Sequence, residues 1–193
     1  MAHEIPLIVD EVFLDYALAG VLPQSFAGWN KTLCFTLSGI SKILRLPQMK
    51  ISWIIVSGPK DLKNQAIEKL EIISDTYLSA SAPAQNALPQ WLESTEKIQK
   101  EILQRLQTNL GTARTELAKT PSKFITPEGG WYGLLEMPGT RTDEEWAMRL
   151  LEKTQVLAHP GYLFDFEQEK YLVLSLLAPP EIFKAGAEKI RSM

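Results

Sequence analysis

The chain has 193 residues, of which 45% are hydrophobic and 22% are charged, the proportions of an ordinary globular protein. Its net charge of −3 offers no basic surface for nucleic acid, and no apolar run approaches the roughly 20 residues that a membrane span needs. One cysteine, Cys34, and two histidines, His3 and His159, argue against a disulfide and against a metal site. The N-terminus lacks a signal-peptide pattern, so we expect a metal-free cytoplasmic protein.

Three short apolar runs near the N-terminus predict buried β-strands, at residues 5–9, 32–38 and 50–59. Asp10 follows the first run, and Gly58 and Pro59 end the third. The runs show little polar alternation, which is typical of strands in a parallel sheet covered on both faces. We therefore expect a small parallel α/β sheet, and we expect Cys34 to be a buried apolar side chain within it.

The spacing of apolar residues changes to a helical period after residue 60. A helix is predicted for residues 60–78, with Leu62, Ile67, Leu70 and Ile73 near one face. A new segment begins near residue 79, and residues 89–118 predict one long amphipathic helix.

The remainder of the chain predicts a small α+β unit. Residues 121–130 are expected to form a loop, and apolar strands are expected at 131–138 and 170–177. Thr142 with Glu145 three residues later is a capping box that begins a helix, and prolines at 179 and 180 begin another. We therefore divide the chain into an α/β domain at residues 1–90, and a long connecting helix with a small α+β domain at residues 91–193.

Asp10 and Lys42 follow two of the predicted strands, and ligands bind at the carboxyl ends of strands in α/β sheets. A lysine amine can form a Schiff base with an aldehyde, and an aspartate can keep a pyridinium nitrogen protonated. Lys50 could supply charge for a phosphate. These are parts of a pyridoxal-phosphate site, although spacing alone favours a solvated aspartate and two surface lysines.

Five segments in order carry a resemblance to a known family: IVDEVFLDY, SGISKILRLPQMKISWIIVSGP, GGWYGLLEMPG, VLAHPGYLFDF and KYLVLSLLAPPEIFKAG. Together they resemble the C-terminal half of class I/II aminotransferases, which are fold-type I pyridoxal-phosphate enzymes. The resemblance implies the C-terminal part of a large parallel-sheet domain at residues 1–90, followed by a connecting helix and a small domain. It also implies amino-group transfer between an amino acid and a 2-oxo acid, and a homodimer for the complete enzyme.

The resemblance assigns roles to five residues. Asp10 is similar to the aspartate that binds the pyridine nitrogen, and Lys42 to the Schiff-base lysine that also moves a proton. Ser41 occupies the small-residue position before that lysine. Lys50 stands where the family usually has a phosphate-binding arginine, and Phe13 where a tyrosine usually contacts the cofactor's phenolic oxygen.

One further departure concerns the substrate, because Val173 stands where the family usually has an arginine that binds the substrate carboxylate. The N-terminal half of the family's site is absent from the sequence, so we expect a fragment that binds pyridoxal phosphate weakly. A lyase or decarboxylase of the same fold, or a non-catalytic interaction fragment, remains an alternative. His159, before Pro160 and Gly161, is expected to be a turn residue, with a substrate contact as the minor alternative.

Overall fold

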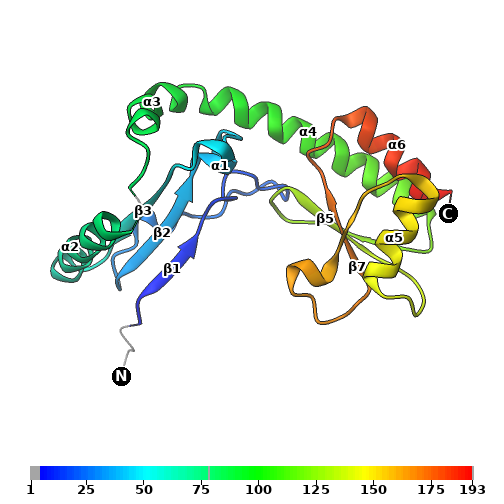
Figure 1. Ribbon diagram of the computed structural model, residues 1–193, viewed down its shortest axis with the longest axis horizontal. Coiled ribbons are helices and arrows are strands. Elements are labelled where there is room, and N and C mark those ends of the chain that lie inside the picture. Colours follow the sequence, from blue (N-terminus) through cyan, green and yellow to red (C-terminus); the bar gives the residue numbers. More distant parts are fainter. Residues whose placement is uncertain (1–4, 78, 193) are drawn as a thin grey trace. The chain divides into compact units, whose positions relative to one another are not determined.

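The computed structural model describes residues 5–77 and 79–192, so His3 lies outside the described residues (Figure 1). Contacts divide the chain into two compact units. The first unit comprises Met1–Ala17 with Val21–Gln99, and the second comprises Leu18–Gly20 with Lys100–Met193. This division falls inside a helix, later in the chain than the expected boundary after residue 90.

The sheet of the first unit has three strands: β1 (Leu7–Asp10), β2 (Cys34–Gly39) and β3 (Ser52–Ser57). β1 is parallel to β2, but β3 is antiparallel to β2, so the expectation of an all-parallel sheet is wrong for β3. Apolar runs carry no information on strand direction, and the short link between β2 and β3 returns the chain directly beside Gly39, which pairs with Ser52. A Cβ on Gly39 would lie 2.8 Å from the carbonyl oxygen of Ile51, so the close return depends on glycine.

The faces of this sheet expose apolar side chains. Ile8 is 75% exposed, and Ile54 and Ile55 on β3 are also exposed. The expected cover on both faces is therefore not present among residues 5–77 and 79–192. Helix α2 (Lys60–Thr76) likewise exposes much of its predicted apolar face, including Leu62, Ile67 and Ile73.

The predicted helix over residues 89–118 is two helices. α3 (Ala82–Leu92) and α4 (Thr95–Glu116) are separated by two residues, Glu93 and Ser94. α4 continues as the 3-10 turn η3 (Leu117–Lys119). The Thr95 hydroxyl donates to the carbonyl oxygen of Leu92 at 2.7 Å, which satisfies a carbonyl at the end of α3. Such side-chain bonds to the backbone compete with continuous helix, which the apolar spacing alone does not reveal.

The core of the first unit gathers around the short helix α1 (Ile40–Ile43), which follows β2 directly. Ile40, Leu44 and Ile51 are buried there together with Ala84 of α3. Partly buried side chains pack against them: Ile43, Leu46, Met49, Trp53, Leu88, Trp91 and Ile98. The backbone of α1 is therefore fixed by apolar packing on several sides.

The second unit contains an antiparallel sheet of β4 (Lys123–Ile125), β5 (Tyr132–Glu136), β6 (His159–Pro160) and β7 (Tyr171–Ser175), in the order β4-β5-β7-β6. The strands predicted at 131–138 and 170–177 are confirmed as β5 and β7. The expectation of a loop throughout 121–130 is wrong, because residues 123–125 pair with β5. Three residues are too few for an alternating pattern to be recognised, and pairing with a distant strand determines their conformation.

Helices α5 (Asp143–Thr154) and α6 (Pro180–Arg191) complete this unit. The predicted capping box is confirmed: Glu145 N–H donates to the Thr142 hydroxyl, and Thr142 N–H donates to the Glu145 carboxylate. The core contains side chains from the sheet and from α4, α5 and α6: Ala113, Leu117, Leu135, Leu150, Leu172, Leu174, Ala187 and Ile190. Across the described part of the chain, no helix combines the length and apolarity that crossing a bilayer requires.

Candidate functional site

Asp10 is the last residue of β1 and pairs with Leu37 of β2. Its side chain is exposed, and its Oδ1 atom accepts the backbone N–H of Val12 at 3.0 Å. This bond engages one carboxylate oxygen and begins the turn that leads away from the strand. The exposed carboxylate retains acceptor capacity for a further donor.

Glu11 secures the chain immediately after Asp10. This residue is buried, and its carboxylate accepts the Ser25 hydroxyl at 2.7 Å and the backbone N–H of Phe26 at 2.6 Å. Phe26 begins the 3-10 turn η1 (Phe26–Gly28). Sequence reasoning did not single out Glu11, because its two partners lie about 15 residues away in a segment without regular periodicity.

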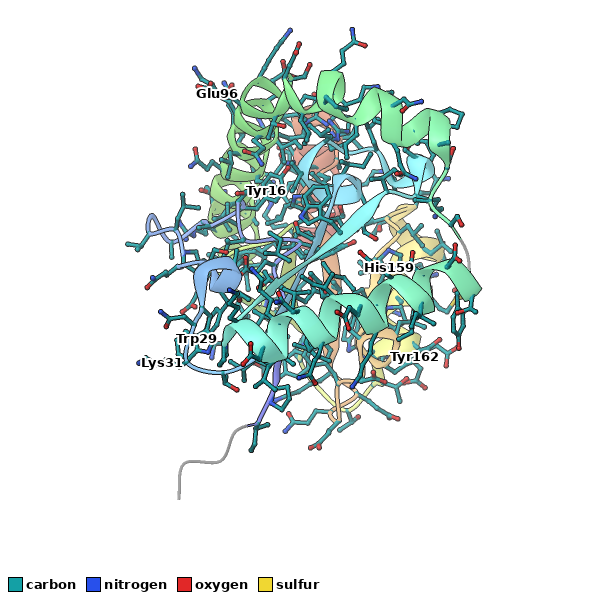
Figure 2. The ribbon with its side chains drawn as sticks, turned by 90° about the vertical axis from the view of Figure 1, so that its left-hand side faces the viewer. Tyr16, Trp29, Lys31, Glu96, His159 and Tyr162 are labelled. Atoms are coloured by element: carbon teal, nitrogen blue, oxygen red, sulfur yellow. The ribbon has the colours of Figure 1, made fainter. Side chains whose placement is uncertain are left out.

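Tyr16 connects the chain after β1 to the helix that carries Lys42. Tyr16, labelled in Figure 2, is fully buried. Its hydroxyl lies 2.9 Å from the carbonyl oxygen of Lys42 and 3.2 Å from that of Ile43. Burial raises the pKa of the Tyr16 phenol, and the negative charge of Asp15 raises it further. Tyr16 is thus a neutral donor at the C-terminal end of α1, where the Lys42 carbonyl also accepts the backbone N–H of Arg45 at 3.4 Å.

The structure brings Lys42 and Phe13 together. The Lys42 Nζ atom lies 5.5 Å from the centre of the Phe13 ring, a cation–π distance. Phe13 belongs to the segment that begins at Asp10, so the amine lies over the chain that follows the strand-end carboxylate. Ser41 precedes Lys42 on α1, and both residues are half-buried.

Lys50 has a different environment from Lys42. It follows the 3-10 turn η2 (Pro47–Met49), adopts a left-handed backbone with φ of 53°, and is exposed. Lys50 lines a groove of about 760 Å³ with residues of β3 and α2, including Ser52 and Trp53. Neither Asp10 nor Lys42 lines this groove.

Val173 lies in the middle of β7 and is 2% exposed. It pairs with Leu134 of β5 on one side and with His159 of β6 on the other. The expectation of a turn at His159 is therefore replaced by an edge strand, and the turn begins after Pro160 as the 3-10 helix η4 (Gly161–Phe164). Cys34 is completely buried, as expected, and no cluster of three or more histidine, cysteine or acidic residues suits a metal ion in the described ranges.

The family model for aminotransferases of class I and II matches residues 1–180 of this chain. Among characterised relatives, the alanine aminotransferase of Mycobacterium tuberculosis is 25% identical over 203 residues, which covers 97% of this chain and 46% of that protein. The glutamate-pyruvate aminotransferase AlaA of Haemophilus influenzae is 28% identical over 168 residues, which covers 83% of this chain and 42% of its own length. The chain thus spans about half the length of the curated relatives it matches.

Solved structures agree with this relationship at the level of the fold. The alanine aminotransferase of Pyrococcus furiosus superposes with a TM-score of 0.86 at 19% identity, covering 98% of this chain and 49% of that one. YbdL of Escherichia coli, for which a methionine aminotransferase function has been identified, gives a TM-score of 0.82 at 19% identity, covering all of this chain and 51% of its own. The α/β aminotransferase fold therefore extends over essentially the whole chain. The chain belongs to the class I and II aminotransferase family.

Proposed function

We propose that this chain supplies the lysine and the aspartate of a pyridoxal-phosphate-dependent aminotransferase. The reaction would move an amino group between an amino acid and a 2-oxo acid. One observation carries the proposal furthest: the Lys42 amine lies 5.5 Å from the ring of Phe13, on the chain that begins at Asp10. Because the chain spans about half of its relatives, the activity of the whole protein is part of the proposal.

The residues of this chain fit the cofactor in their chemistry. Asp10 has one carboxylate oxygen bonded to Val12 N–H and is exposed, so its other oxygen can bind a protonated pyridine nitrogen. When bound, the cofactor would act as an electron sink for the substrate's α-carbon. Lys42 would hold the cofactor covalently through Nζ before the substrate binds. Once the substrate's amine has displaced it, the freed Lys42 amine would move the substrate's proton.

The supporting residues act through position. Tyr16 fixes the two carbonyls at the end of α1 and so limits the orientations of Lys42. Phe13 presents a ring face in place of the hydroxyl that the family usually offers, so no phenol from this position donates to the cofactor. Lys50 would add a positive charge for the phosphate, without the bidentate hydrogen bonding that an arginine provides.

The names of the relatives suggest alanine, glutamate and pyruvate as first substrates to assay, and the family suggests a homodimer for the complete enzyme. Val173 favours one second candidate, a lyase or decarboxylase of the same fold. A buried valine cannot bind the carboxylate through a guanidinium, which loosens the usual recognition of a 2-oxo acid acceptor. Analysis of the products formed from an amino acid with and without 2-oxoglutarate separates the two reactions.

The test uses the natural polypeptide that carries this segment, assayed for amino transfer from L-alanine to 2-oxoglutarate. Replacing Lys42 by alanine removes the proton-transferring amine, and we expect kcat to fall by about 10²- to 10⁴-fold. Lys69→Ala, an exposed change on α2, is the matched control and should leave kcat unchanged. Full activity of the Lys42→Ala protein would contradict the proposal.

A further inference from the structure

The second unit contains a cavity of about 430 Å³. Its walls come from the segment that follows α5, from β7 and from α6, the helix drawn in red in Figure 1. All the lining residues belong to the second unit, so the cavity is complete within it. Its volume lies in the range of about 300–1,000 Å³ that is typical of small-molecule sites. Neither Asp10, Lys42 nor Lys50 lines it.

The side chains that line this cavity are mostly aliphatic. Leu174 and Ile190 are buried and belong to the core of the unit. Leu157 is 75% exposed and Ile182 is 62% exposed, so the cavity also has apolar side chains where it opens to solvent. Phe183 is the one aromatic residue among the described lining residues. A ligand in this cavity would bury aliphatic surface along its length, which favours a hydrocarbon chain.

Among the described lining residues, Lys189 is the one that carries a charge. Its Nζ atom donates to the carbonyl oxygen of Thr154 at 2.9 Å, and an ammonium group has two further N–H donors. The carbonyl end of α5 carries about half a negative charge, which is less than the full positive charge of Lys189. Since no acidic side chain is among the described lining residues, the cavity favours an anionic end group.

Gly186 contributes open space to the cavity. It lies within α6, where glycine is a poor helix former. A Cβ atom at this position would meet only Val156 Cγ2, at 4.0 Å, which is ordinary van der Waals contact. Close packing therefore does not require glycine here, and a larger side chain would occupy part of the cavity.

We propose that this cavity binds a free linear carboxylate of medium chain length, of the size of octanoate. The hydrocarbon chain packs against α6, Val156 and Leu157, and the carboxylate accepts from Lys189. Fourteen residues line the cavity, fewer than the roughly 20–30 that each partner contributes to a typical protein interface, which favours a small molecule over a second chain. The inference is independent of the proposed function, because the site involves neither Lys42 nor the cofactor.

The test is saturation-transfer NMR on the natural polypeptide that carries this segment, titrated with octanoate, hexanoate and octan-1-ol. Each buried CH₂ group corresponds to about fourfold in affinity, so octanoate should bind about tenfold more tightly than hexanoate. The uncharged alcohol should bind more weakly than octanoate. Lys189→Gln should weaken octanoate binding by about twofold to fivefold, as expected for an exposed ion pair, and leave octan-1-ol binding unchanged.

Gly186→Leu fills the cavity and should weaken octanoate binding by about tenfold or more. Gly111→Leu is the matched control, because Gly111 is an exposed glycine of α4 with nothing within 4 Å of an added Cβ atom. Leucine is the better helix former, so urea unfolding should show both variants to be at least as stable as the unaltered protein.

Absence of saturable octanoate binding by the unaltered polypeptide would overturn the inference, including the case in which another segment of that polypeptide fills the cavity. Equal octanoate binding by Gly186→Leu and the unaltered protein would also overturn it. Equal affinities for octanoate and octan-1-ol, or unchanged octanoate binding by Lys189→Gln, would overturn the assignment of a carboxylate. The comparisons of chain length and charge use the unaltered protein, so they decide the question even if Gly186→Leu does not fold.

Discussion

Replacing Tyr16 by phenylalanine tests whether the hydroxyl of this buried residue fixes the helix that carries Lys42. The change removes a donor that lies 2.9 Å and 3.2 Å from two carbonyl oxygens at the end of α1, while the ring and its packing remain. A typical hydrogen bond contributes about 1 kcal/mol net, and a buried group left without its partner costs about 1–3 kcal/mol. We therefore expect the free energy of unfolding to fall by about 1–2 kcal/mol.

Urea unfolding followed by tryptophan fluorescence measures this loss, because Trp53 and Trp91 pack around the core that includes α1. With an m value of about 2 kcal/mol/M, the midpoint should fall by roughly 0.5–1 M and m should be unchanged. Tyr162→Phe is the matched control, since Tyr162 is 48% exposed. Equal midpoints for the two variants would refute the anchoring role of Tyr16.

The same residue gives a pH dependence. Burial raises the pKa of Tyr16, so the folded state favours the protonated phenol. The contribution of the protonated phenol to stability is complete below the ordinary tyrosine pKa of about 10. It is lost as the pH rises through the higher pKa that Tyr16 has in the folded state. The stability difference between the unaltered protein and Tyr16→Phe should therefore shrink at alkaline pH. A constant difference from neutral to strongly alkaline pH would contradict this assignment.

Three other changes test the fold. Thr142→Ala should cost about 1 kcal/mol through loss of the capping box in thermal or urea unfolding, whereas the exposed Thr140→Ala should cost nothing measurable. Gly39→Ala should destabilise the first unit by about 1–3 kcal/mol, because the new Cβ meets the backbone of the returning chain. A hydrogen bond from Lys119 lowers the pKa of Glu116, so its contribution to stability is present above the ordinary carboxyl pKa and is lost as pH falls. Between pH 7 and pH 3, the unfolding midpoint of Glu116→Gln should therefore fall less steeply than that of the unaltered protein. The same dependence on pH in both proteins would contradict this.

Local patterns predicted the elements whose signals lie within a few residues. The apolar run before Asp10 predicted the strand β1, although not its exposure, since Ile8 is 75% exposed. Thr142 with Glu145 predicted the start of α5, because helix capping depends on side chains a few residues apart. The family resemblance, rather than spacing, singled out Lys42.

Long-range contacts account for what could not be predicted. The antiparallel direction of β3 depends on the return of the chain beside Gly39, and β4 forms because residues 123–125 meet β5. Tyr16 reaches Lys42 across 26 positions, and the neighbour of Val173 is His159 only once β6 and β7 have paired. None of these contacts leaves a periodic or motif-like mark in the chain.

The central claim is that Lys42 is the amine that bonds to pyridoxal phosphate. The most direct measurement is incubation of the protein with the cofactor, reduction with borohydride, and peptide mass mapping of the modified lysine. We expect the label on Lys42, its loss in Lys42→Ala, and its retention in Lys50→Ala at a weaker affinity. A label distributed over exposed lysines such as Lys60 and Lys69, with Lys42 unmodified, would contradict the account.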